Sequence, residues 1–280
     1  MQTIVIGATG VLGRHVVPRL LERGHHVRAV VRTPQQAVMC QRQGAEAVLG
    51  DILDAASLHV AVTGCEAALH LATAIPKPGG PQDWGPNDRI RREGTQNLLI
   101  ACQQAGVRRY MQQSTAFLYN FQGAELADET TPLRAHPFLQ STSDMENLVQ
   151  ASLLDWCILR GGFFYGPGTC EDAWRETARQ GSLQLPGDGK DRLSLIHVVD
   201  MARAVVLATE KAPPRSIYNV VDDQPVSYAA LYQYVAAQVG GPLPSPGGPV
   251  LLPSFGCRND RLKAELGWWP AYPTYRSGLA

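Results

Sequence analysis

The stretch TIVIGATGVLGRHVVPRLLERG, residues 3–24, decides the fold of this chain. It opens with a compact apolar run at 3–6, passes through a glycine turn, and then carries apolar residues at 12, 16, 17, 20 and 21. The first run predicts a buried strand, and the three-to-four-residue spacing of the second predicts an amphipathic helix. A strand that leads through a tight turn into a helix is the opening unit of a parallel sheet.

The turn itself has the spacing G-x-x-G-x-x-G, with glycines at 7, 10 and 13. Glycine is needed there because a side chain would block a phosphate group or the contact between helix and sheet. The free N–H groups and positive dipole end of the helix then attract phosphate. The turn therefore predicts a dinucleotide site formed by Gly7, Thr9, Gly10, Val11, Leu12 and Gly13. The alternative is a glycine-rich turn that binds nothing.

The end of the second predicted strand bears on the type of dinucleotide. An NAD site usually places Asp or Glu about 20 residues beyond the turn, where it binds the ribose hydroxyls. This chain instead has VVRTP at 30–34, with Arg32 at that point and Arg14 directly after the glycine turn. Two guanidinium groups suit a 2′-phosphate, so the sequence favours NADP over NAD. The alternative is that Arg32 is a solvated loop residue.

The rest of the chain extends this alternation of strands and helices. Strands are predicted at 26–31, 47–49, 67–71, 110–113, 156–159 and 217–221, and helices at 87–105, 138–154, 199–209, 228–239 and 259–266. The pattern predicts an α/β fold with a Rossmann-type doubly wound parallel sheet. We expect a dinucleotide-binding domain over 1–165, with return segments near 190–222, and a smaller, interleaved substrate lobe over 166–280.

Composition excludes several broad classes of partner. The 280 residues contain 25 Lys plus Arg and 25 Asp plus Glu, so the net charge is zero and gives no general attraction to nucleic acid or anionic membranes. The six cysteines lack metal-ligand or redox spacing, which predicts buried apolar side chains and no metal site. With neither a signal peptide nor a run of 18 apolar residues, a cytoplasmic protein with a small-molecule substrate is expected.

Several further motifs follow one another in a recognisable order. Besides GATGVLG at 7–13, the chain has GDILD (50–54), LHLAT (69–73), EGTQNLL (93–99), QQSTAFLY (112–119), ILRGGFFYGPG (158–168), IHVVDMARA (196–204), YNVVDD (218–223) and NDRLKAELGWWP (259–270). In these motifs the chain resembles, nearly end to end, the extended, epimerase/dehydratase-like branch of the short-chain dehydrogenase/reductases.

The resemblance implies roles for residues outside the glycine turn. Asp51 and Ile52 should border the adenine, although Asp51 could equally be a turn or helix-cap residue. By the same likeness, the cofactor's ribose and phosphate should be lined by Leu71, Ala72 and Thr73, and Gly162 and Phe163 should meet the nicotinamide. The family often pairs its long helices across a dimer, which implies a homodimer. Loops 75–85 and 124–136 should set the substrate specificity.

The catalytic positions depart from the family pattern. The family uses a Tyr-x-x-x-Lys pair, a Ser or Thr, and an Asn in the long helix. In HPFLQSTSDMENL at 136–148 the tyrosine position is Phe138 and the lysine position is Thr142. The Asn position is Arg91, and only Thr115 keeps a family-type group. Asp144 and Glu146 are expected on an outer helix face.

This loss matters because hydride delivery to a carbonyl leaves an alkoxide that must gain a proton. A positioned acid contributes about a hundredfold to ten-thousandfold in rate, and Phe138 has no proton to give. Tyr119, Tyr165 and His136 are candidate replacements, each with packing or solvation as the alternative. Arg91 is a candidate for holding a substrate carboxylate or an oxyanion, again with packing or a solvated face as the alternative.

Two functions are therefore compatible with the sequence. The first is an NADP-dependent oxidoreductase or epimerase/dehydratase-like enzyme with non-standard acid/base groups, and activated C=C bonds would suit it because they lessen the need for the tyrosine. The second is a non-catalytic, NADP-binding regulatory or sensor protein. A protein that keeps the fold and binds no cofactor is a weaker third possibility.

Overall fold

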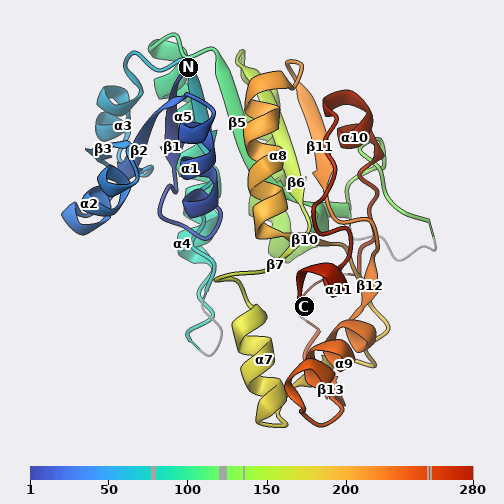
Figure 1. Cartoon of the computed structure of the whole chain (residues 1–280). Helices are drawn as coiled ribbons and strands as arrows, with labels where there is room; N and C mark the ends of the chain where they lie inside the picture. Colours follow the sequence, from blue (N-terminus) through green and yellow to red (C-terminus); the bar gives the residue numbers. More distant parts are fainter. Residues whose placement is uncertain (77–79, 120–124, 135, 251, 253, 280) are drawn as a thin grey trace. The chain divides into compact units, whose positions relative to one another are not determined.

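The computed structural model describes the whole chain apart from residues 77–79, 120–124, 135, 251, 253 and 280. Its centre is a seven-stranded sheet with the order β11-β6-β5-β4-β1-β2-β3. The strands in that order are β11 (Ser216–Val220), β6 (Asp155–Gly161), β5 (Arg109–Thr115), β4 (Ala67–His70), β1 (Gln2–Ile6), β2 (His26–Val31) and β3 (Glu46–Leu49) (Figure 1). The pairs from β5 to β3 are parallel, with β1 between β4 and β2. The predicted α/β fold with a doubly wound sheet is confirmed.

The helices follow the strands along the chain. They are α1 (Gly13–Glu22), α2 (Pro34–Arg42), α3 (Ala55–Val62), α4 (Gly85–Arg89), α5 (Thr95–Gln104), α6 (Gln140–Ala151), α7 (Glu171–Arg179), α8 (Val198–Lys211), α9 (Tyr228–Val239), α10 (Asp260–Leu266) and α11 (Tyr275–Gly278). The sequence did not predict α2, α3, α7 or α11. Both α2 and α3 begin at a side-chain cap, Thr33 for α2 and Asp54 for α3.

The helix expected over 87–105 is present without a gap from Gly85 to Gln104. It contains a π-helical turn, η1 (Ile90–Gly94), between α4 and α5. Short 3-10 turns at Ala116–Tyr119 (η2) and Pro137–Leu139 (η3) also replace expected helix or loop. Short strands complete the fold: β7 (Phe163–Tyr165), β8 (Gln184–Pro186), β9 (Arg192–Leu193), β10 (Leu195–His197), β12 (Val226–Ser227) and β13 (Ser245–Gly248).

The described chain forms two compact units. The first contains Met1–Ser114, Gln140–Leu159 and Ala202–Ile217, and the second contains Thr115–Leu139, Arg160–Met201 and Tyr218–Ala280. These units differ from the division predicted at residue 165, because Thr115–Leu139 and Arg160–Tyr165 cluster with the second unit. The chain therefore passes between the units several times.

The first unit shows the alternation expected of a sheet covered on both faces. Ile4 and Ile6 belong to a core cluster with residues of α3, α5 and α6, including Leu58, Leu98 and Val149. Side chains of successive strand residues point to opposite faces, and α1 packs against β1 and β2. Burying one such aliphatic side chain stabilises a fold by about 1.5–3 kcal/mol, so this cluster is a main source of the stability of the unit.

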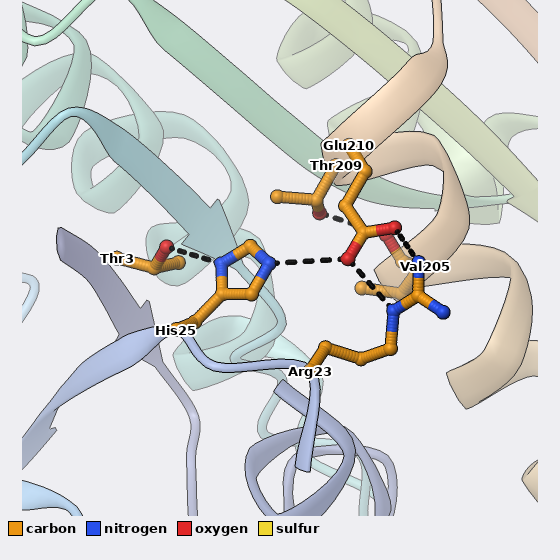
Figure 2. A network of polar contacts seen from close by, with 6 residues as sticks. All are labelled: Thr3, Arg23, His25, Val205, Thr209 and Glu210. Atoms are coloured by element: carbon orange, nitrogen blue, oxygen red, sulfur yellow. Dashed lines mark hydrogen bonds and ion pairs between the residues drawn. The ribbon is translucent and has the colours of Figure 1, made fainter. Parts of the chain in front are cut away.

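A polar network joins the turn after α1 to the end of α8 within the first unit (Figure 2). The Glu210 carboxylate accepts hydrogen bonds from Arg23 at 2.9 and 2.5 Å and lies 3.2 Å from His25 Nε2. The other ring nitrogen of His25 lies 3.2 Å from Thr3 Oγ1 of β1. Because His25 is nearly buried, the network fixes α8 next to the first strand.

The cysteines agree with the expectation of buried apolar side chains. All six cysteines are free; five are buried and Cys170 is half-buried. Burial raises the pKa of the Cys102 thiol to about 12, which keeps that thiol protonated. Among the described residues, no helix combines the length and apolar character needed to cross a bilayer.

Candidate functional site

The glycine turn connects β1 to α1, and the surroundings of its three glycines differ. Gly7 has φ +85°, and a Cβ there would lie 2.7 Å from the Ala72 nitrogen at the end of β4. A Cβ at Gly13 would lie 2.1 Å from the Gly7 carbonyl oxygen. At Gly10 the only atom close to such a Cβ is the Gly7 oxygen, at 3.2 Å. Two glycines are thus required by packing, while Gly10 leaves space beside the turn for a ligand.

The start of α1 presents backbone donors beside that space. Leu12 is the N-cap residue of the helix, and no side chain caps it. Gly10 and Val11 are exposed, Thr9 is half-buried, and Leu12 is buried against the sheet. An uncapped helix start with exposed glycine is suited to a phosphate group. The residues present therefore fit the pyrophosphate of a dinucleotide.

The two arginines that favour NADP are exposed in the first unit. Arg32 directly follows β2, and its backbone N–H donates to Gln36 Oε1 at 3.0 Å. Arg14 lies in the first turn of α1, with its Nε 3.4 Å from the Val11 carbonyl oxygen. Among the described residues Arg32 forms no ion pair, so its guanidinium is available to a ligand. The preference for NADP stays a prediction.

Asp51 and Ile52 form a structured turn before α3. Asp51 Oδ1 accepts from the Leu53 N–H at 2.9 Å, and the Asp51 N–H donates to Ser57 Oγ at 3.1 Å. Ile52 is buried, and a Cβ at Gly94 would lie 3.1 Å from its side chain. The Asp51 carboxylate thus stabilises a turn, which was the alternative interpretation of this residue. Its role beside the adenine stays a prediction.

The segment Leu71–Thr73 follows β4 and approaches the glycine turn through Gly7. Leu71 is buried, Ala72 half-buried and Thr73 exposed. The next N–H, of Ala74, donates to the Oδ1 atom of the buried Asn87 at 3.0 Å. The Asn87 Nδ2 atom is buried without a hydrogen-bond partner in the described part of the chain. A bound polar group at this strand end would satisfy that donor.

Arg91 lies in the π-helical turn and is half-buried. One of its guanidinium nitrogens donates to Ser141 Oγ at 3.3 Å, and this hydroxyl donates to Asp88 Oδ1 at 2.6 Å. Burial lowers the pKa of Arg91 to about 10, so the side chain stays charged at neutral pH. The position that holds Asn in the resembled family therefore holds a cation here.

The Tyr and Lys positions give no ordinary acid/base pair. Phe138 lies half-buried in η3 of the second unit, and its N–H donates to His136 Nδ1 at 3.3 Å. Thr142 is buried in α6 of the first unit, where its Oγ1 has no partner among the described residues. Thr115, at the end of β5, is half-buried, and its Oγ1 accepts from the Phe117 N–H at 3.4 Å.

Glu146 corrects the sequence analysis. It is 1% exposed and accepts a hydrogen bond of 2.5 Å from Ser114 Oγ of β5, so it does not lie on an outer helix face. A buried carboxylate that accepts a hydroxyl ties α6 to the strand beside it. Asp144, in contrast, is half-buried and forms an ion pair of 2.7 Å with Arg92.

The two candidate replacement tyrosines are packing residues. Tyr119 is fully buried, donates to Asn219 Oδ1 at 2.8 Å and accepts from Arg160 at 2.9 Å. Tyr165 is fully buried and its hydroxyl donates to the Thr274 carbonyl at 3.3 Å. Burial raises the pKa of both hydroxyls well above 10, which removes them from proton exchange near neutrality. His136 is exposed.

Gly162 directly precedes β7 of the second unit, and Phe163, the first residue of β7, belongs to a row of aromatic rings. A Cβ at Gly162 would lie 2.6 Å from the Ser194 carbonyl, so that position requires glycine. The ring of Phe163 stacks on Phe117 at 5.9 Å and on Trp174 at 5.6 Å between centroids. Phe117 and Phe163 are half-buried and pack against the core of the second unit.

Sequence reasoning missed three features of this region: the π-helical turn, the buried Ser114–Glu146 bond and the aromatic row. The EGTQNLL motif marks the segment that contains the turn, but its apolar spacing is that of ordinary helix. The specificity loops lie partly outside the described residues, at 77–79, 124 and 135.

Comparison with known proteins places these features in a family. Residues 7–207 match the model of the NAD(P)H-binding family. A "3-diazoavenalumate denitrifying reductase" from Streptomyces sp. is 34% identical over the whole chain and 99% of the relative. A 2-alkyl-3-oxoalkanoate reductase from Stenotrophomonas maltophilia is 29% identical over 86% of the chain and 77% of the relative.

Solved structures agree on the fold. A dTDP-glucose 4,6-dehydratase from Streptomyces venezuelae superposes with a TM-score of 0.88 at 22% identity, covering the whole chain and 95% of that protein. A UDP-glucose 4-epimerase from Thermus thermophilus gives 0.84 at 25% identity, covering the whole chain and 96% of the epimerase. The chain therefore belongs to the NAD(P)H-binding family and has the extended short-chain dehydrogenase/reductase fold of epimerases and dehydratases.

Proposed function

We propose that this protein is an NADPH-dependent reductase of aryl diazonium compounds, a substrate class that accepts hydride without needing a proton from the protein. The observation that carries this proposal is the combination of an intact glycine turn with Phe138 and Thr142 at the acid/base positions. Such a chain keeps the means to hold a hydride donor and lacks the usual means to protonate an alkoxide.

The chemistry of the substrate determines whether that loss matters. When bound, the reduced nicotinamide supplies a hydride, and hydride plus an aryl diazonium ion balances as a new arene C–H bond, a broken C–N bond and released N₂, with no proton consumed. A ketone, in contrast, becomes an alkoxide, and a positioned acid contributes about a hundredfold to ten-thousandfold to its reduction. Diazonium reduction therefore suits this chain better than carbonyl reduction.

A further finding supports the proposal. The Streptomyces relative, similar over the entire chain, is named a denitrifying reductase of a diazo compound. This name is the reason for choosing a diazonium group among the acceptors that need no proton.

The chain's own residues then have mainly binding and positioning roles. The glycine turn and the start of α1 hold the pyrophosphate, and Arg14 and Arg32 bind the 2′-phosphate. Asn87 positions the segment after β4 through the Ala74 N–H. The buried Ser114–Glu146 bond fixes α6, which carries Thr142, to β5.

The test is an assay of the purified protein with NADPH and an aryl diazonium salt. We expect protein-dependent oxidation of NADPH with one N₂ released per NADPH, above the rate without protein. The same protein should reduce ketones and aldehydes at least a hundredfold more slowly. A matched variant, Phe138→Tyr/Thr142→Lys, should not be faster with the diazonium salt, because no acid is needed.

Other outcomes would overturn the proposal. Faster reduction of carbonyl compounds than of diazonium salts would show that an unrecognised acid operates. NADPH binding without turnover of any diazonium, carbonyl or enone substrate would favour the non-catalytic regulatory protein instead.

A further inference from the structure

Three arginines lie in the segment that joins α4 to α5, and one differs from its neighbours. Arg89 and Arg92 are exposed and pair with Glu93 and Asp144 respectively, each at 2.7 Å. Arg91 is half-buried, and in the described part of the chain no carboxylate lies within 4.0 Å of its guanidinium. The most buried of the three cations is thus the one without a direct ion pair, and Asp88, linked to it through Ser141, favours its charged form.

The local contacts hold Arg91 through the Ser141 hydroxyl and without a direct bond to a carboxylate. Ser141 Oγ accepts from the guanidinium and in turn donates to Asp88, which leaves most of the five guanidinium N–H groups to other partners. Ser141 directly precedes Thr142, the position at which the resembled family carries lysine. The charge lost from α6 is therefore matched by a charge on the turn that packs against α6.

The position of Arg91 in the first unit is that of a ligand-binding residue. It belongs to a π-helical turn, a feature frequent at functional sites. It lies close enough to His70 to influence its titration: burial, with a smaller contribution from the Arg91 charge, lowers the pKa of His70 to about 4. His70 ends β4, and ligands of open parallel sheets bind at the carboxyl ends of the strands.

We propose that Arg91 binds a carboxylate group of the aromatic substrate, which makes the preferred substrate an aryl carboxylate. This inference rests on the proposed function for the aryl part. A guanidinium recognises a carboxylate through two parallel hydrogen bonds, and an anion there would give Arg91 a direct ion pair in addition to the charge of Asp88. The cofactor's phosphates are assigned to the turn between β1 and α1, and Arg91 lies beyond β4. Ser141 and Asp88 act as positioning residues for the guanidinium.

The experiment is a calorimetric titration of the NADP⁺-loaded protein with 4-hydroxycinnamate and with its uncharged methyl ester. Neither probe contains a diazo group, so binding is measured independently of turnover. We expect the acid to bind at least tenfold more tightly than the ester. Arg91→Met should weaken acid binding by about tenfold to a hundredfold, as expected for loss of a charge-assisted pair, and leave ester binding unchanged.

Two further variants keep the test decisive. Arg92→Met removes a neighbouring, exposed arginine and should leave acid binding unchanged. Arg91→Lys keeps the charge and the fold but loses the bidentate geometry, so it should retain part of the preference for the acid. Ser141→Ala should weaken binding of the acid by a smaller factor than Arg91→Met does.

Several results would overturn the inference. These are equal binding of acid and ester, no binding of either, or an Arg91→Met variant that loses NADP⁺ affinity and not acid affinity. Acid binding that needs Arg91 in a protein without diazonium turnover would instead contradict the proposed function and leave the carboxylate site in place. The two proposals therefore fail separately.

Discussion

Replacing Arg32 by alanine tests how this chain selects its cofactor. Arg32 follows β2 directly, at the point where an NAD site usually has an acid. Its backbone is fixed by Gln36, and α2 starts two residues later with Thr33 as N-cap. The substitution therefore removes the guanidinium without changing the strand or the helix.

The magnitude follows from the exposure of the side chain. A hydrogen bond to a charged group contributes about 1.5–3 kcal/mol, and solvent screening of an exposed pair favours the lower end. We therefore expect Arg32→Ala to raise the Kd of NADPH by about tenfold. The Kd of NADH, which lacks the 2′-phosphate, should be unchanged. Adding Arg14→Ala should raise the Kd of NADPH further and again leave the Kd of NADH unchanged.

The assay is calorimetric titration of nucleotide-free protein with each cofactor at two salt concentrations. The NADPH affinity of the original protein should fall at higher salt, since exposed charges are screened. Arg42→Ala, an exposed arginine in the last turn of α2, is the matched control and should change neither affinity. Tighter binding of NADH than NADPH by the original protein, or equal weakening of both by Arg32→Ala, would refute the reasoning.

Three further predictions concern packing and pH. Gly13→Ala should abolish cofactor binding and lower the free energy of unfolding, because its Cβ would lie 2.1 Å from the Gly7 oxygen; a variant that binds NADPH normally would contradict this. Glu146→Ala should cost about 2–3 kcal/mol in urea denaturation, because it leaves the Ser114 hydroxyl buried and unpaired; a loss below about 0.5 kcal/mol would argue against a structural role. The hydrogen bond from Arg23 lowers the pKa of Glu210 below its ordinary value of 4.5. The ionised carboxylate therefore stabilises the fold fully above pH 4.5, and this stabilisation is lost as the pH falls through the lowered pKa. Urea denaturation at several pH values should therefore show a weaker loss of stability in acid for Glu210→Gln than for the original protein, and identical profiles would remove the assigned contribution.

The sequence predicted the fold well where local signals and tertiary structure agree. The strand His26–Val31 and the helix Tyr228–Val239 have the predicted bounds. The helix starts at the capping residue Ser227 and ends at Gly240, which has φ 69°. The glycine turn was also predictable, because it requires residues without side chains at fixed spacing.

The missed features depend on partners that are distant in the sequence. Glu146 reads as an exposed helical acid until Ser114, 32 residues earlier, is placed beside it. The apolar residues of this segment have the spacing of an ordinary helix, so their periodicity does not reveal the π-helical turn. The aromatic row combines Phe117, Phe163 and Trp174 from separate segments. The homodimer and the cofactor preference stay predictions.

The most direct measurement of the central claim uses isotopic labelling of the proposed reaction. An aryl diazonium salt is incubated with the protein and NADPH deuterated at the transferable position, or with unlabelled NADPH in D₂O, and the arene is analysed by mass spectrometry. The account predicts one deuterium per arene from the labelled cofactor, none from D₂O, and one N₂ per product. Deuterium from D₂O at the new C–H bond, or no protein-dependent arene, would contradict it.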